Sequence, residues 1–343
     1  MRTEALEARV AGMFAKLGIP EGAARRVAAA LVTADLEGVA SHGVMLVPMY
    51  VDRMLAGSVS SITRAEAVHD GGTAVVLDAA NMLGQLSSAQ AVEILVKRAK
   101  EHGLASVAVR NGFHFGAAGY WARAIAAEGL IGIVLSNTRP LMPPPGGAER
   151  IVGNNPLAIA FPAASGAPLV ADMALSATAM GRIRLAEAAG KPIPEGWAAD
   201  EHGQPTTDAA AAIKGMLLPA AGPKGFGLAV AIDLLCGGLS GGAIADEVAP
   251  LYGDPRQPYR CSHLFIALGP ARFGIADLSG RVDQLAGRIR GAKRAPGNER
   301  IYAPGDLERA RRTANAGEVP VPPEVLAKLN ECAAKLGVER KLP

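Results

Sequence analysis

Two histidines lie at breaks between apolar segments, where a side chain can reach a ligand. His114 stands in Asn111-Gly112-Phe113-His114-Phe115-Gly116, between an apolar stretch at 104–109 and a Gly/Ala-rich helix start. His42 stands far upstream, in Ser41-His42-Gly43. The ordinary pKa of imidazole, about 6.5, suits it to exchange protons near neutral pH. In a chain with only six histidines, two placed this way predict acid–base chemistry.

Small polar and charged residues end other predicted strands or begin helices. Asp172 follows the apolar stretch 169–171, and its ordinary role would be to cap the next helix. Residues 136–138 (Ser-Asn-Thr) end another strand. Lys224 begins a helix after Gly222-Pro223, where free N–H groups and a positive charge suit a phosphate, although a lone lysine is usually only solvated.

Helix and strand patterns alternate along the chain and predict an α/β sheet with helical cover. The predicted strands are 74–77, 104–109, 130–135, 157–161, 169–171 and 263–268. The predicted helices are 1–18, 21–37, 44–55, one capped by Ser87 or Ser88 that ends near 103, 116–128, 177–189, one starting at 224, and 324–336. The stretch 191–207 is expected to be an extended surface loop.

The composition excludes several classes of protein. The 343 residues are 50% hydrophobic but only 4% aromatic, which is typical of a tightly packed α/β core. The net charge is +3, and the densest basic cluster, at 288–300, has no interleaved aromatic residue, so no nucleic-acid binding is expected. The sequence shows no signal peptide and no apolar run of about 20 residues, which predicts a cytoplasmic protein without a membrane span.

Cysteine usage and glycine motifs narrow the chemistry further. Cys236, Cys261 and Cys332 are too far apart for a CxxC site, and they indicate a reducing compartment and no metal site. No GxGxxG turn follows a predicted strand, and no Walker A pattern occurs. A nucleotide cofactor must therefore be held by another arrangement.

Six segments occur together in a specific order. They are Ser41-His42-Gly43-Val44, Asn111-Gly112-Phe113-His114-Phe115-Gly116, Gly146-Gly147-Ala148-Glu149, Asn154-Asn155-Pro156-Leu157-Ala158, Asp172-Met173-Ala174 and Leu218-Pro219-Ala220-Ala221-Gly222-Pro223-Lys224-Gly225. Over roughly Leu6 to Val338 the chain resembles the type-2 malate/L-lactate dehydrogenase family. That family includes ureidoglycolate and sulfolactate dehydrogenases, 2,3-diketogulonate reductases and cyclic imino-acid reductases.

The resemblance implies a non-Rossmann mixed-sheet α/β fold with helical N- and C-terminal cover, and it accounts for the missing glycine fingerprint. It implies NAD or NADP as cofactor and a homodimer whose subunits both shape the active site. The expected organisation is a helical region 1–75 packed with the C-terminal segment, a cofactor-binding core 76–300 and a C-terminal helical segment 301–343, with no linker-separated domains.

The resemblance also assigns acid–base roles. His42 would be a proton donor or a cofactor-proximal group, oriented by Ser41 and Asp172. His114 would be the proton acceptor, as in ureidoglycolate dehydrogenase-like members. The residues alone also allow a plainer interpretation, in which Ser41 caps a helix, His42 lies at the surface and His114 is a partly buried structural histidine. The choice between the two histidines stays open.

Cofactor and substrate contacts are implied residue by residue. The expected cofactor contacts are Gly116, Ala117, Ala118, Ser136, Asp172, Met173, Ala174, Pro223, Lys224, Pro304 and Gly305, of which the last two also fit a plain turn. The expected substrate contacts are Leu46, Tyr50, Asn154 and Arg139. Many relatives carry a carboxylate-binding arginine where this chain has Leu46, and a threonine where it has Asn154. Arg139, Arg150 and Arg182 are the possible replacements for that arginine.

These observations predict an NAD(P)-dependent oxidoreductase that transfers a hydride between nicotinamide and C2 of a 2-hydroxy or 2-oxo acid. The nearest alternative is a reductase of cyclic imino acids, which acts on C=N. A hydrolase built on Ser41, His42 and Asp172 is disfavoured because no GxSxG elbow is present. A noncatalytic cofactor-binding homologue is the remaining alternative.

Overall fold

The computed structural model describes residues 1–338, so residues 339–343 of the predicted C-terminal segment lie outside the described residues. The helices are α1 (Thr3–Lys16), α2 (Glu21–Leu36), η1 (Ala40–His42), η2 (Val44–Leu46), α3 (Val47–Leu55), α4 (Gly84–His102), α5 (Ala118–Ala126), α6 (Met180–Ala188), α7 (Ala209–Lys214), α8 (Pro223–Asp233), η3 (Leu234–Gly238), η4 (Ala245–Glu247), η5 (Pro270–Phe273), α9 (Leu278–Arg290), α10 (Asp306–Ala314) and α11 (Pro323–Lys335). The strands are β1 (Glu66–Asp70), β2 (Ala74–Asp78), β3 (Leu104–Gly112), β4 (Ile131–Ser136), β5 (Leu157–Phe161), β6 (Leu169–Met173), β7 (Ala198–Ala199), β8 (Pro205–Thr206), β9 (Met216–Leu217) and β10 (Cys261–Leu268).

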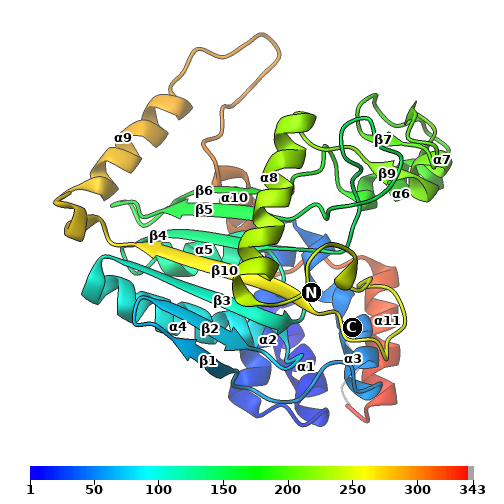
Figure 1. The fold of residues 1–343 in the computed structure, drawn as a ribbon, viewed down its shortest axis with the longest axis horizontal. Helices are drawn as coiled ribbons and strands as arrows, with labels where there is room; N and C mark the ends of the chain where they lie inside the picture. Colours follow the sequence, from blue (N-terminus) through cyan, green and yellow to red (C-terminus); the bar gives the residue numbers. More distant parts are fainter. Residues whose placement is uncertain (339–343) are drawn as a thin grey trace.

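A mixed seven-stranded sheet forms the centre of the molecule, in the order β1-β2-β3-β10-β4-β5-β6 (Figure 1). Strands β2 and β3 are parallel and are joined by the crossover helix α4, whereas the other neighbouring pairs are antiparallel. This arrangement confirms the predicted mixed α/β fold of non-Rossmann type.

Both faces of the central strands are covered, which explains their apolar sequences. Val107 and Val109 of β3 belong to the cluster that includes residues of α4 and α5. Ala108, between them, belongs to the second cluster, with Ala229 and Ile232 of α8. Helix α8 lies across the sheet face that α4 and α5 leave open (Figure 1). Successive side chains of β3 therefore point alternately into two different cores.

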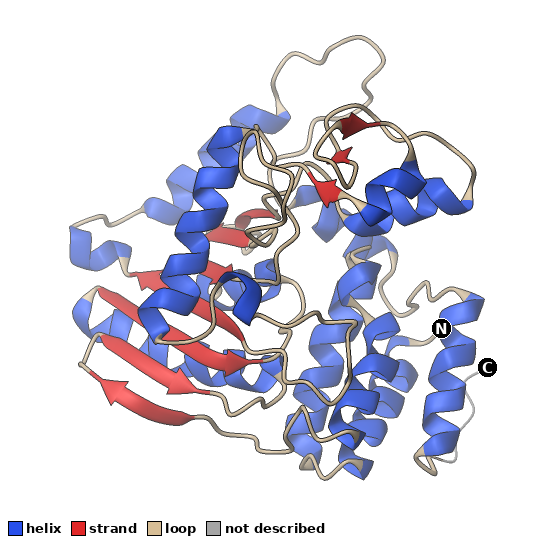
Figure 2. Cartoon of the chain, turned by 45° about the vertical axis from the view of Figure 1, so that its right-hand side comes forward, coloured by secondary structure: helices blue, strands red, loops and turns tan. Residues whose placement is uncertain are grey.

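The ends of the described chain pack together beside the sheet (Figure 2). The amino group of Met1 donates to the Val319 carbonyl at 3.0 Å, and the Thr3 N–H donates to the Gly317 carbonyl at 3.0 Å. Leu329 of α11 is buried in the same cluster as Leu6 of α1. These contacts join the N-terminal helices to the C-terminal segment, while the boundaries at 75 and 300 stay a prediction.

The structure differs from the predicted elements in several places, including these three. Strand β1 was not expected, because its five residues are all exposed and carry no apolar alternation. The expected loop 191–207 contributes β7 and β8, which pair with β9 in a small second sheet. Helix α4 begins at Gly84, one turn before the expected caps Ser87 and Ser88.

The early start of α4 has a packing reason. A Cβ at Gly84 would lie 2.1 Å from the Phe113 carbonyl oxygen and 2.6 Å from that of His114. Glycine therefore lets the first turn of α4 pack against the backbone beside His114. Within residues 1–338, no helix is both long and apolar enough to cross a membrane.

Candidate active site

Most of the predicted site segments lie at one end of the central strands, which is called the sheet edge below. The antiparallel pairs Gly112↔Cys261, Ser136↔His263 and Leu157↔Met173 place the ends of β3, β4 and β6 beside the beginnings of β10 and β5. His114 and Arg139 follow β3 and β4, Asn154 precedes β5, and Asp172 lies near the end of β6. This edge is therefore the candidate active site.

The two predicted acid–base histidines meet at this edge although 72 positions separate them in the chain. The rings of His42 and His114 are stacked, with centroids 5.5 Å apart and planes at 28°. Nδ1 of His42 lies 2.9 Å from the Ser41 hydroxyl. Desolvation lowers the pKa of His42, so the neutral ring is favoured.

The loop that carries His42 rests on a buried carboxylate. The Val44 N–H donates to Oδ2 of Asp35 at 2.7 Å. A Cβ at Gly43 would lie 2.2 to 2.3 Å from the Asp35 carboxylate oxygens, so this close approach requires glycine. Burial raises the pKa of Asp35 to about 7, and the Val44 N–H offsets only part of this shift.

His114 is held by a phenol. The Tyr50 hydroxyl lies 2.6 Å from Nδ1 of His114 and 3.2 Å from its carbonyl oxygen, and it accepts from Nε2 of Gln85 at 3.2 Å. Nε2 of His114 has no hydrogen-bond partner among residues 1–338. Desolvation, followed by repulsion from His42 and His263, lowers the pKa of His114 well below its ordinary value.

A third histidine lies behind the pair. His263 in β10 is fully buried, stacks on Phe115 at 4.3 Å, and contacts the Ser136 hydroxyl at 2.9 Å. Burial lowers its pKa to about 4, so it is neutral at pH 7. Because the Ser136 hydroxyl also donates to the Asn137 carbonyl at 3.0 Å, it is engaged within the protein. Its predicted contact with a cofactor stays a prediction.

Asp172 lies inside β6 and does not cap the next helix, which starts only at Met180. Its carboxylate instead accepts from the Gly119 N–H at 2.9 Å, in the first turn of α5. Although the residue is exposed, desolvation by the surrounding chain raises the pKa of Asp172, partly offset by that N–H and by Arg123. Within residues 1–338 no hydrogen bond joins Asp172 to His42, so the hydrolase triad is not assembled.

The predicted cofactor segments lie along neighbouring backbone. The Ala220 N–H donates to the Leu175 carbonyl, which connects Asp172-Met173-Ala174 to the loop before Pro223 and Lys224. The Val170 N–H donates to the Pro304 carbonyl, and Gly305 packs against Val170, with φ at +88°. Gly116, at φ +84°, precedes Ala117 and Ala118 at the start of α5.

The start of α8 suits a phosphate-bearing cofactor. Its N-cap residue, Gly222, supplies no side-chain hydrogen bond, and Lys224 is exposed and makes no ion pair among the described residues. A cavity of about 590 Å³ adjoins this helix start, lined in part by Gly146, Gly147 and Pro223. Free N–H groups and a nearby cation are what a pyrophosphate requires.

The predicted substrate residues differ in accessibility. Leu46 and Tyr50 are 1% and 0% exposed. Oδ1 of Asn154 accepts from the Thr138 hydroxyl at 3.0 Å. Arg139 is partly buried and, within residues 1–338, forms no hydrogen bond or ion pair. Desolvation and the nearby charges of Arg150 and Arg184 lower its pKa.

The other two arginine candidates are less suited to a carboxylate. The Arg150 side chain donates to the carbonyls of Lys214 and Gly215. Arg182 is exposed on α6. Of these three candidates, Arg139 therefore best suits an anion, because it follows β4 at this edge and makes no hydrogen bond among residues 1–338. Among the described residues, no group of His, Cys, Asp and Glu is arranged to hold a metal ion.

The sequence interpretation missed three residues of this site, namely Asp35, Gln85 and His263. Gln85 precedes the expected start of its helix, and His263 begins an apolar strand. The one available signal is that Asp35 shares a helix face with the apolar residues Ala28, Leu31 and Val32.

Comparisons with known proteins agree with this geometry. A family model described as malate/L-lactate dehydrogenase matches residues 1–330. The chain is 35% identical to a malate dehydrogenase of Pyrococcus abyssi over 96% of this chain and 93% of the relative. The solved structure of sulfolactate dehydrogenase from Methanocaldococcus jannaschii superposes with a TM-score of 0.93 at 34% identity, covering 98% of this chain and 97% of the other.

A second solved structure is similar but has a different named activity. The delta1-piperideine-2-carboxylate reductase from Pseudomonas syringae pvar. tomato superposes with a TM-score of 0.87 at 28% identity, covering 97% of this chain and 99% of the other. Other relatives have names that specify either NADP(+) or NAD(+). The chain is therefore an oxidoreductase and belongs to the malate/L-lactate dehydrogenase family.

Proposed function

We propose that the enzyme oxidises a 2-hydroxy acid, or reduces the corresponding 2-oxo acid, with NAD or NADP. The observation that carries this proposal is the stacked pair His42–His114 at the same sheet edge as an unpaired guanidinium, Arg139. The histidine pair would exchange the hydroxyl proton of the substrate, and Arg139 would bind its carboxylate.

The start of α8 would bind the cofactor phosphates through its N–H groups and Lys224, and the segments Gly116–Ala118 and Asp172–Ala174 would line the same groove. When bound, a nicotinamide supplies the two-electron acceptor or donor for C2. The protein contributes position, exclusion of water and the proton. The names of the relatives support either coenzyme.

The proposed proton acceptor for the substrate hydroxyl is Nε2 of His114. Its partner nitrogen is occupied by Tyr50, and its lowered pKa keeps the ring neutral and able to accept at pH 7. In the oxidative direction, Nε2 takes the hydroxyl proton as the C2–H bond breaks. A charge on His42 would oppose a second charge on His114, so the stacked pair carries one proton at a time.

Arg139 is the proposed carboxylate ligand, in place of the arginine that many relatives carry where this chain has Leu46. Repulsion from Arg150 and Arg184, with no carboxylate among the groups that shift its pKa, makes an incoming anion favourable there. A bidentate guanidinium–carboxylate pair would also fix the orientation of C2. Tyr50 and Asn154 remain proposed neighbours of the substrate.

A cyclic imino acid is the second candidate substrate, because the similar Pseudomonas syringae structure is named for such a reductase. The same cofactor site would serve both reactions. Steady-state assays with NADH and NADPH against 2-oxo acids and against pyrroline- or piperideine-2-carboxylate would separate the two. Turnover of neither class with either coenzyme would contradict the proposal and favour a noncatalytic homologue.

A homodimer in a reducing, cytoplasmic compartment is also proposed. Leu228, Leu235 and Leu239, spaced along one side of α8 and its continuation, are 44%, 42% and 61% exposed, and a second copy would cover them. The three cysteines are buried and free, as expected for a reducing compartment. Light scattering on the purified protein tests the dimer, which a monomer mass at micromolar concentration would exclude.

A further inference from the structure

The hydrogen bonds of Tyr50 determine which ring nitrogen of His114 carries the proton. Gln85, in the first turn of α4, is fully buried, as is Tyr50. Nε2 of Gln85 donates to the Tyr50 hydroxyl, and that hydroxyl in turn contacts both Nδ1 and the carbonyl oxygen of His114. The phenol oxygen therefore has three polar neighbours in a site without solvent.

A phenol has one proton to donate and can accept at its oxygen, which limits how these contacts can be made together. The Gln85 N–H uses one acceptor position. If the phenol proton goes to the His114 carbonyl, the oxygen accepts a second hydrogen bond from Nδ1–H, and all three contacts are satisfied. If the proton goes to Nδ1 instead, the phenol and carbonyl oxygens face each other at 3.2 Å with no proton between them.

The reverse orientation of the Gln85 amide leads to the same tautomer. Its carbonyl oxygen would accept the phenol proton, and the phenol oxygen would then accept from Nδ1–H of His114. In the orientation observed, Oε1 of Gln85 is buried without a partner among the described residues, so no other group competes for this amide. Both orientations leave Nε2 as the unprotonated nitrogen.

We propose that Tyr50 is a positioning residue that, by giving its proton to the His114 carbonyl, holds neutral His114 in its Nδ1–H tautomer and so makes Nε2 the nitrogen that exchanges the proton. The consequence for turnover rests on the proposed function. The tautomer itself does not, because it is a property of the protein without cofactor or substrate.

The test is long-range ¹H–¹⁵N correlation NMR on protein labelled at histidine, at pH 8, with the His114 signals assigned by their loss in His114→Asn. We expect the ¹⁵N shift of Nδ1 to be that of a protonated nitrogen and the shift of Nε2 that of an unprotonated one. In Tyr50→Phe, we expect both shifts to move toward the average of the two tautomers, because no phenol oxygen then accepts from Nδ1–H.

Tyr259→Phe is the matched control. Tyr259 is a buried tyrosine that packs edge-on against Phe113, with ring centroids 6.0 Å apart, and among the described residues no hydrogen bond joins its hydroxyl to His114. We expect His114 to keep its shifts in Tyr259→Phe. Gln85→Leu should also keep them, because the His114 carbonyl still takes the phenol proton, and the shifts of the wild-type protein keep the inference testable if Tyr50→Phe does not fold.

Turnover provides a second readout. Losing the hydrogen bond between Tyr50 and Nδ1 should lower kcat by about five- to tenfold in Tyr50→Phe, with cofactor affinity retained. An Nε2–H tautomer in the wild-type protein, or unchanged His114 shifts in folded Tyr50→Phe, would overturn the inference. Failure to bind either coenzyme would instead refute the proposed function and leave the NMR result intact.

Discussion

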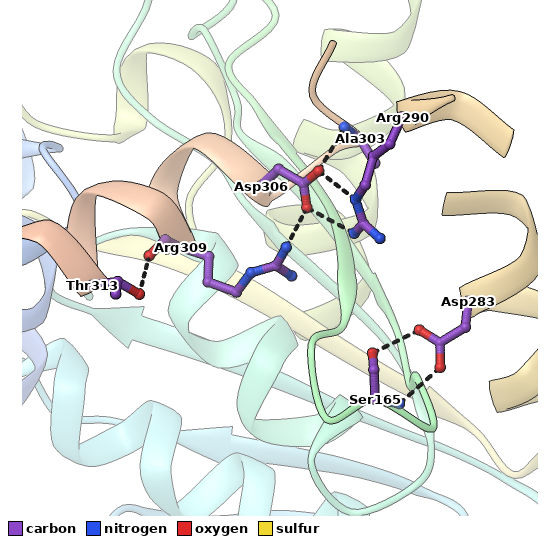
Figure 3. Close-up of polar contacts among 7 residues, drawn as sticks. All are labelled: Ser165, Asp283, Arg290, Ala303, Asp306, Arg309 and Thr313. Carbon is purple, nitrogen blue, oxygen red and sulfur yellow. Dashed lines mark hydrogen bonds and ion pairs between the residues drawn. The ribbon is translucent and has the colours of Figure 1, made fainter. Parts of the chain in front are cut away.

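Two buried carboxylates, in two regions of the molecule, differ in how far neighbouring groups neutralise their charge. Asp306, at the junction of α9 and α10, accepts from Arg290 at 2.7 and 2.9 Å, from Arg309 at 2.7 Å and from the Ala303 N–H at 2.9 Å (Figure 3). The Arg290 side chain thereby lowers the pKa of Asp306 to about 2. Asp35, beneath the His42 loop, has only the Val44 N–H, and burial raises its pKa to about 7.

The histidines extend this comparison. At the sheet edge, desolvation lowers the pKa of His42, His114 and His263, and it raises that of Asp172. Each of these groups is pushed toward its neutral form. The junction at Asp306 is a compensated structural contact, whereas the sheet edge leaves charge uncompensated. In such an environment the neutral histidines can accept a proton at pH 7, and binding of an anion beside Arg139 is electrostatically favourable.

The largest expected effect is at His114. The amide of His114→Asn cannot exchange a proton near neutral pH, so we expect kcat to fall by about 10²- to 10⁴-fold while cofactor affinity is retained. Steady-state kinetics on the best substrate measures this. His69→Asn, at an exposed position of β1, is the control and should keep its activity. A fall below tenfold would move the acid–base role to His42.

The next effect concerns Arg139. Removing an ionic ligand of the substrate carboxylate in Arg139→Leu should raise KM by about 10- to 100-fold, with the coenzyme dissociation constant unchanged. Arg182→Leu, which removes an exposed arginine of α6, is the comparison and should leave KM as it is. Equal KM values in the two variants would place the carboxylate elsewhere.

The compensated region should respond in stability and not in turnover. In Asp306→Asn the charge that Arg290 and Arg309 neutralise is lost, and the lowered pKa corresponds to about 2 kcal/mol of unfolding free energy at pH 7. This contribution is present above pH 4 and is lost as the pH falls through about 2, because the unfolded chain binds the proton first. Urea titrations at pH 7 and pH 3 measure it.

The matched control for that variant is Asp283→Asn. Asp283 accepts only from the exposed Ser165, through its hydroxyl and its N–H, both at 2.7 Å (Figure 3). We expect a much smaller change there than in Asp306→Asn, as for most exposed contacts. Equal losses in the two variants would contradict the distinction drawn between them.

The smallest effect should appear at Asp35, with the opposite pH dependence. The folded chain holds this proton more tightly than the unfolded chain, so the native state loses stability as pH rises from about 4 to about 7. Asp35→Asn should recover on the order of 1 kcal/mol at pH 8 relative to pH 5. The recovery is partial because the amide NH₂ would lie beside Gly43. An unchanged pH profile would show that Asp35 is ionised without cost.

Elements with at least one apolar face could be predicted from the sequence, and an element without an apolar face could not. The central strands, buried on both faces, were recognised at 104–109 and 263–268, whereas the fully exposed β1 was not. The start of α4 was misplaced because Gly84 is selected by the Phe113 and His114 carbonyls, far away in the chain.

The candidate site divides along the same line. His42 and His114 could be found because each stands at a local break in pattern. The hydrogen bonds of Asp35 to Val44, Gln85 to Tyr50 and Asp172 to Gly119 could not, because they depend on how separate elements pack. Local sequence therefore indicates which groups do chemistry, and tertiary packing determines their protonation.

The most direct test of the whole account is calorimetric titration of the wild-type protein with NADH and with NADPH. The account predicts that at least one of them binds with a stoichiometry of one per chain, and that Lys224→Gln weakens that binding. No measurable binding of either coenzyme to the folded protein would contradict it.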